Sequence, residues 1–186
     1  PGAINARATA DMDLHRLVNL LAIEPSGRQS LPKKVSLDFK TAILQQPDAV
    51  VLNALDADLR LDEKTRLLHL DLLQPLIMRN TAGGTRIGNA AGPLATLTIS
   101  DIQLDWFSAF VPDTTLKGKL QRADFTLAAE GQGSATLTSV KPVRLDNVTI
   151  TGPDGPILKD VAISVSPSVR LAPDGTRITY KGLNVT

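Results

Sequence analysis

The chain has 186 residues, with 20 Lys and Arg side chains against 19 Asp and Glu, so its formal net charge is only +1. This balance argues against a dedicated nucleic-acid binder, which carries a strongly basic face. The absence of cysteine excludes disulfides, thiolate catalysis and zinc–sulfur sites. A hydrophobic content of 42% with only 3% aromatic residues predicts a folded domain with a mainly aliphatic core.

The chain begins Pro1-Gly2-Ala3, without an initiator Met or a basic and apolar leader. Its apolar stretches fall far short of the ~20 residues that a membrane helix needs. We therefore expect a piece of a longer protein, whose targeting signals and anchors lie outside this sequence.

Two short segments have helical spacing. Residues 14–21 place Leu at i, i+3 and i+7, with Asp11 or Asp13 as the N-cap. Residues 104–111 repeat the spacing, with Asp101 or Asp105 as the cap and Pro112 as the stop. We expect a short helix in each segment.

Most of the remaining sequence alternates apolar and polar residues with period two, the pattern of strands that bury one face. Clear runs cover residues 35–40, 55–62, 68–72, 97–99, 125–129 and 161–165, and turn residues separate them at 62–66, 152–156 and 172–175. The sequence therefore predicts a mainly β protein, an antiparallel meander forming an elongated curved sheet or groove with one or two short helices. A closed β-sandwich is the alternative.

An internal repeat is indicated by residues that match at a constant offset of 90. Gly2 matches Gly92 and Asp11 matches Asp101, and the same offset relates four apolar pairs beginning with Ile4 and Leu94. We expect a first β unit over residues 1–79 and a second over residues 92–186, with a short helix near 101–111. The Gly-rich residues 80–91 between them are expected to form a mobile loop.

Candidate catalytic and metal-binding residues are few. His15 and His69 have no acid or second ligand at motif spacing, so both are interpreted as surface histidines. Asp56 and Asp58 point the same way on one expected strand, yet the central Gly and terminal Glu of a calcium loop are missing. We predict no catalytic residues, no metal site and no cofactor, and therefore a protein that is not an enzyme.

Two segments resemble the AsmA-like and TamB-like family of bacterial envelope proteins. Residues 2–21 are similar to its "Gly-x-Leu … Asp-Leu … Leu-Leu" units. Residues 104–120 resemble its junction of a short helix, a Pro and a Leu-x-Gly-x-Leu strand. The resemblance implies a long curved sheet with an apolar inner face, in a periplasmic protein anchored in the inner membrane. It further implies transport of phospholipids or maintenance of envelope lipid balance, with phospholipid acyl chains and other envelope proteins as partners.

An open sheet with an aliphatic face leaves apolar area in water, and acyl chains could cover it. The alternative function is a structural or adhesive β-repeat domain of a secreted or surface protein that binds protein partners. The expected lipid-facing surface is formed by Leu37, Phe39, Leu59, Leu61, Leu70, Leu72, Leu97 and Ile99.

Overall fold

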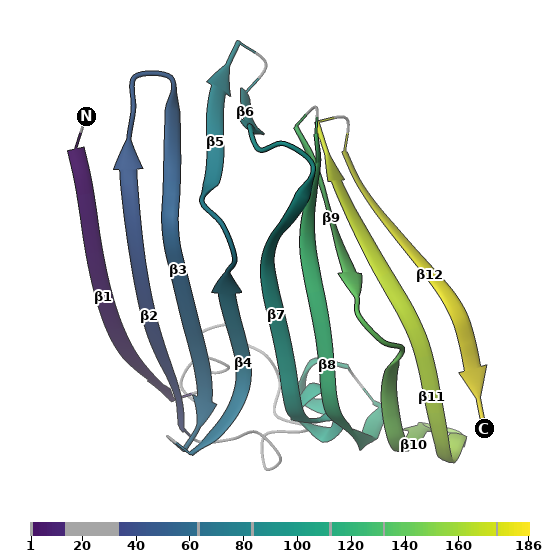
Figure 1. Cartoon of the computed structure of the whole chain (residues 1–186). Helices are drawn as coiled ribbons and strands as arrows, with labels where there is room; N and C mark the ends of the chain where they lie inside the picture. The colour runs from purple at the N-terminus through teal and green to yellow at the C-terminus, as the bar shows by residue number, and fades with distance from the viewer. Residues whose placement is uncertain are drawn as a thin grey trace.

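The computed structural model describes residues 2–13, 34–62, 64–82, 84–111, 113–131, 133–173 and 175–186. Within them the chain is mainly β and folds as an antiparallel meander, which confirms the predicted fold class (Figure 1). The strands are β1 (Gly2–Asp13), β2 (Lys34–Gln45), β3 (Ala49–Leu61), β4 (Thr65–Leu72), β5 (Leu76–Thr81), β6 (Gly84–Ile87), β7 (Gly92–Gln103), β8 (Thr115–Gly131), β9 (Ser134–Ser139), β10 (Val143–Gly152), β11 (Gly155–Ala172) and β12 (Gly175–Val185).

All twelve strands belong to one sheet, with the order β1-β2-β3-β4-β7-β8-β10-β11-β12. β5 pairs with the first half of β3, and β4 pairs with the second half. In the same way, β9 and β10 pair with different parts of β8 and of β11. The sheet is therefore a long ribbon of strands whose outer members are β1 and β12 (Figure 1).

The described strands form a single layer. Apart from a contact between β6 and β9 and the packing of the 3-10 helix η2 (Leu104–Phe110) on β8, extensive contacts join only hydrogen-bonded neighbours. A sandwich needs two facing sheets, so the described strands do not form the closed alternative. Nearly complete burial is correspondingly rare among the described side chains, with Leu94 and Val148 as the largest examples.

Turn chemistry explains where several strands end. β10 and β11 form a hairpin in which Gly152 pairs with Gly155, as predicted for this Pro-Gly segment. β11 and β12 likewise meet at Ala172 and Gly175, the second predicted turn. The backbone of Gly155 and Gly175 has a positive φ, a conformation that side chains with a Cβ disfavour.

The Gly-rich segment is not the loop that the sequence predicted. Asn80 and Thr81 end β5, and residues 84–87 form β6, which pairs back onto β5. The Thr81 hydroxyl donates a hydrogen bond of 2.7 Å to the carbonyl of Gly84 and helps to close the turn. The glycine content correctly indicated a turn. The residues on either side of it, however, form an antiparallel ladder that reaches from Thr81 and Gly84 to Met78 and Ile87.

The helix predicted near residues 101–111 is a 3-10 helix of 7 residues, η2, and its predicted caps are wrong. Asp101 lies within β7, where its carboxylate is 2.8 Å from the ammonium of Lys119. Asp105 lies in the first turn, and Gln103 occupies the N-cap without a side-chain hydrogen bond. The helix predicted at residues 14–21 and the predicted stop at Pro112 lie outside the described residues.

The two predicted units meet inside the sheet. β1 and β7 both have 12 residues and begin at Gly2 and Gly92, the first matched pair of the predicted repeat. β4 pairs directly with β7, from Leu72 opposite Ala95 to Leu68 opposite Ile99. The boundary between the units is therefore a continuous ladder, and it creates one surface across both.

Candidate functional site

All eight residues of the predicted lipid-facing surface lie on one face of the sheet. Residues that are directly opposite in an antiparallel ladder project to the same face, and alternate residues of a strand do so too. Leu37 is opposite Leu59, and Leu70 is opposite Leu97. Following these relations along and across the strands assigns the remaining members to the same face, which we call the apolar face.

Two transverse rows make the apolar face continuous over six strands, from β1 to β8. In each row every residue is the direct register partner of the next, and every member is apolar. The first row is Ala8, Phe39, Ala57, Leu70, Leu97 and Phe125. The second row is Ala10, Leu37, Leu59, Leu68, Ile99 and Ala123.

The large side chains of the apolar face are only partly covered. Leu37 is 38% exposed, and the other seven predicted residues have intermediate burial. Side chains of a closed core would be almost fully buried. This face therefore keeps apolar area available for a ligand or partner.

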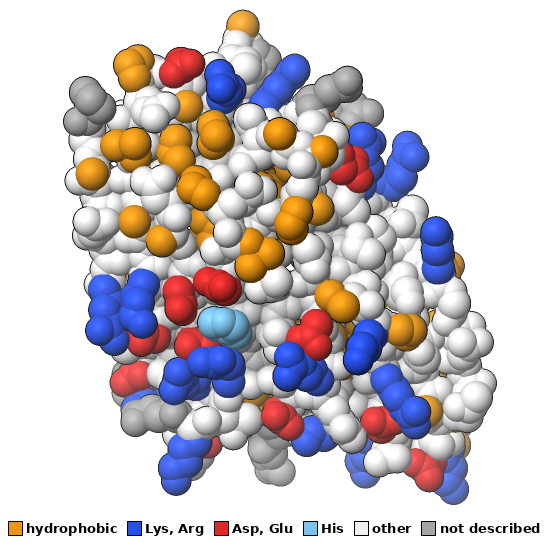
Figure 2. Space-filling model, in the orientation of Figure 1, with side chains coloured by type: hydrophobic (Ala, Val, Ile, Leu, Met, Phe, Trp, Pro, Cys, Tyr) orange, Lys and Arg blue, Asp and Glu red, His pale blue; other side chains and the backbone are white. Residues whose placement is uncertain are grey.

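The opposite face, which we call the polar face, carries a row of hydrogen-bonding residues in the same register. His69 is the only histidine among the described residues, so the face seen in Figure 2 is the polar face. Figure 2 shows charged side chains in a band below a region of hydrophobic side chains. The row is Thr9, Asp38, Asp58, His69, Thr98 and Asp124.

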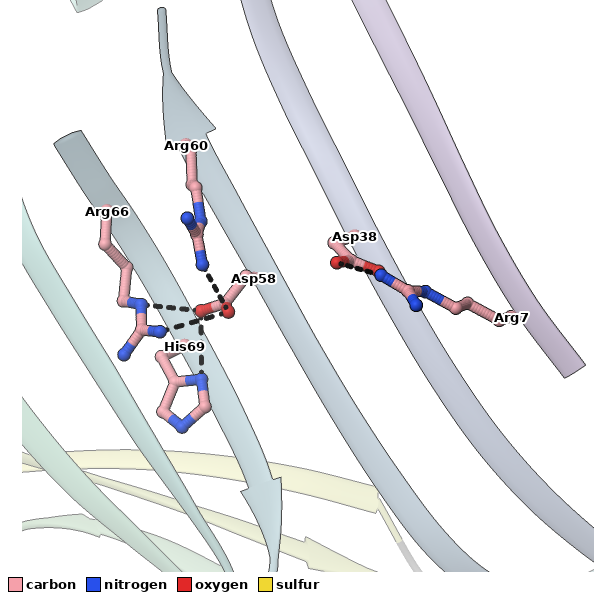
Figure 3. Close-up of polar contacts among 6 residues, drawn as sticks. All are labelled: Arg7, Asp38, Asp58, Arg60, Arg66 and His69. Carbon is pink, nitrogen blue, oxygen red and sulfur yellow. Dashed lines mark hydrogen bonds and ion pairs between the residues drawn. The ribbon is translucent and has the colours of Figure 1, made fainter. Parts of the chain in front are cut away.

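Asp58 is the centre of an ion-pair network on the polar face (Figure 3). Its carboxylate is 10% exposed and accepts a hydrogen bond of 3.2 Å from Arg60. Arg66 binds both carboxylate oxygens, at 2.7 Å through Nε and 3.1 Å through Nη2. His69 Nδ1 lies 3.0 Å from Oδ1. An ionised carboxylate only accepts hydrogen bonds, so His69 is the donor here.

These contacts set the charge state of Asp58. Burial alone raises the pKa of this carboxyl, but the hydrogen bond from Arg60 and the charges of Arg66 and His69 more than offset it. The pKa of Asp58 therefore lies below its ordinary value. The network joins β3 to β4, and beside it Asp38 on β2 binds Arg7 on β1 at 3.3 Å.

The pairing of His69 with Asp58 adds an acid that motif spacing did not reveal. The two residues are 11 apart along the chain and become neighbours only through the β3–β4 register. The interpretation of His69 as a residue on the polar side of its strand is confirmed. His15 lies outside the described residues.

Asp56, Asp58 and His69 offer three ligand atoms within 4.8 Å of one another. Both oxygens of Asp58 are occupied by guanidinium groups, however, and a divalent cation would have to displace them. Two fixed positive charges also oppose a metal ion electrostatically. The geometry at this cluster favours a structural ion-pair network.

A second set of charges lies next to this network on the polar face, towards the hydrophobic region. Arg7, Lys40, Asp56 and Asp71 are successive register partners on β1 to β4, and we call them the dipolar row. They line part of an open hollow of about 530 Å³. Ala42 and Ala54 line it from the hydrophobic side.

Both edge strands are exposed along their whole length. Every residue of β1 and of β12 is exposed. On β12 the large apolar side chains Ile178, Tyr180, Leu183 and Val185 are 72%, 68%, 56% and 52% exposed, respectively. An edge strand of this kind presents unpaired backbone groups to another strand.

Among the described residues, no helix has the length and apolar character required to cross a membrane. Comparison with known proteins gave no match to a family model, a curated protein or a solved structure.

Proposed function

We propose that this chain is a non-enzymatic part of a periplasmic AsmA-like protein, and that its apolar face shelters phospholipid acyl chains during transport or in envelope lipid homeostasis. The observation that supports the proposal is the pair of unbroken apolar rows across six strands, whose large side chains are partly exposed. The inner-membrane anchor implied by the family would lie outside this sequence.

The chemistry of the rows suits an acyl chain. Leu70 and Leu97 lie near the middle of the first row, where the two units meet. Burial of one CH₂ group of a lipid contributes about 0.8 kcal/mol, so a chain that lies along part of a row gains several kcal/mol. Leu and Ala dominate the rows, and they offer no polar group that would fix the chain at one position.

Phospholipid binding by face-specific variants tests the proposal. Leu70→Asp and Leu97→Asp place a charge on the apolar face, and Thr126→Asp places one on the polar face of β8. We expect both Leu variants to lose most of the phospholipid retained in native mass spectrometry and organic extraction, whereas Thr126→Asp retains it. Thermal unfolding checks that all three fold. Equal lipid retention by folded Leu and Thr variants would contradict the proposal.

A second candidate function is that of a structural β-repeat domain that binds protein partners, and the exposed edge β12 favours it. Strand addition there would pair the free backbone groups and cover Ile178 and Tyr180. Ile178→Lys should then reduce concentration-dependent association in sedimentation experiments. If the chain is monomeric at all concentrations and captures no strand-forming partner, this second function is excluded.

A further inference from the structure

We propose that the hollow on the polar face binds the head group of a zwitterionic phospholipid, with the ammonium at Asp56 and Asp71 and the phosphate at Lys40 and Arg7. This site uses residues on the opposite face from the apolar rows. It concerns the same ligand class as the proposed function and adds recognition of the head group.

The order of charges in the dipolar row carries the inference. Two cations, Arg7 and Lys40, are followed by two anions, Asp56 and Asp71, across four adjacent strands. Adjacent strands are about 4.8 Å apart. A phosphate and an ammonium joined by an ethanolamine link can bridge one such spacing, from Lys40 on β2 to Asp56 on β3.

Three members of the row lack partners of their own. Within the described part of the chain, the side chains of Lys40, Asp56 and Asp71 form no hydrogen bond or ion pair. This contrasts with Asp58, which two arginines and a histidine neutralise. Asp56 and Asp71 are also direct cross-strand partners, an arrangement of like charges that is unfavourable without a counter-charge. A ligand with both charges would complement the row.

The surface next to the row supplies a place for acyl chains. Along β2 the residues after Lys40 on this face are Ala42 and Leu44, and their register partners on β3 are Ala54 and Val51. Val51 is in turn opposite Ile77 on β5. The hydrophobic region above the charged band in Figure 2 therefore adjoins the hollow, and one amphiphile can contact both.

Short-chain lipids test the site. Dihexanoyl phosphatidylethanolamine and dihexanoyl phosphatidylglycerol have the same acyl chains. The first carries an ammonium group in its head group, and the second carries an uncharged glycerol in its place. We expect the wild type to bind the ethanolamine lipid about tenfold more tightly in calorimetry. The double variant Asp56→Asn/Asp71→Asn should lose this preference. A control variant, Asp154→Asn/Asp160→Asn, makes the same charge change at two exposed positions on the β10–β11 side and should keep it.

Equal affinity of the wild type for the two lipids would overturn the inference, as would a preference that survives in the folded Asp56/Asp71 variant. Removal of a like-charge pair should not lower the melting temperature of this variant. The melting temperature therefore distinguishes loss of the head-group site from loss of the fold. In either case, if the binding of long-chain phospholipid still depends on Leu70 and Leu97, the proposed function remains and only the head-group site is rejected. If only the ethanolamine preference responds to its variant, the site stands and the proposed function falls.

Discussion

Leu70 on β4 and Leu97 on β7 are direct register partners across the ladder that joins the two predicted repeat units. Their pairing has two consequences. It makes the units parts of one sheet, and it continues the apolar rows from β4 into β7 without a polar interruption. The apolar rows therefore cross both predicted units because the units share a ladder.

Truncation of core and face residues should have different effects on stability. Leu94 is fully buried, whereas Leu97 on the same strand is partly exposed. We expect Leu94→Ala to lower the free energy of unfolding by about 2–5 kcal/mol, and Leu97→Ala to lower it by less than about 2 kcal/mol. Urea unfolding measures both. Equal losses would indicate that the apolar face is a closed core.

Removal of the Asp58 carboxylate should destabilise the β3–β4 ladder. Asp58→Asn keeps the size of the side chain but leaves Arg60 and Arg66 without their shared anion. We expect a loss of about 1–3 kcal/mol at neutral pH, measured by urea unfolding. Asp154→Asn in an exposed turn is the matched control and should be neutral. A neutral effect of Asp58→Asn would show that the network contributes nothing to stability.

Stability should fall in acid. The hydrogen bond from Arg122, together with one from Thr98, outweighs the effect of burial and lowers the pKa of Asp124, and the pKa of Asp58 is lowered as well. An acid whose pKa is lower in the folded state stabilises the fold above its unfolded pKa, and this stability is lost as the pH falls through the folded pKa. The loss should therefore develop below about pH 4.

Thermal unfolding across pH 2–7, a range set by the ordinary carboxyl pKa values, measures this effect. Asp58→Asn should flatten the acid limb of the profile. If the acid limb of the pH profile is unchanged in this variant, carboxyl groups other than Asp58 cause the acid sensitivity.

Gly118 should not tolerate a side chain. Its φ is +135°, and a Cβ there would lie 3.0 Å from Leu104 Cδ1 and 3.1 Å from the carbonyl oxygen of Asp146. We expect Gly118→Ala to lower the free energy of unfolding by about 1–3 kcal/mol. Gly2→Ala, where a Cβ meets no atom within 4 Å, is the control and should be near neutral. Similar melting temperatures for the two variants would contradict this packing.

The sequence predicted those features that depend on local periodicity. Alternation assigned Leu37, Leu59, Leu70 and Leu97 each to the apolar side of its own strand, because side-chain direction in a strand has a period of two. The register shows that these sides form one face. Features that depend on register could not be predicted. Asp58 meets His69 only through the β3–β4 ladder, and the dipolar row requires four strands to align.

The segment around residues 80–91 shows a different limit of sequence reasoning. Its Gly and Asn residues favour a turn, and a turn forms there, but the flanking residues gain backbone pairing as β5 and β6. The short helix near residue 104 shows the same limit, since its spacing was recognised while its 3-10 geometry and its cap were not. Backbone pairing between β5 and β6 decided the first of these outcomes.

Photo-cross-linking shows directly whether acyl chains lie on the apolar face. A phospholipid with a diazirine in its acyl chain would be bound to the wild-type chain, irradiated, and the modified residues mapped by mass spectrometry. We predict cross-links on Leu37, Phe39, Leu59, Leu70, Leu97 and Ile99, and their loss in Leu70→Asp. Cross-links confined to the polar face, or no specific labelling of a folded chain, would contradict acyl-chain binding on the apolar face.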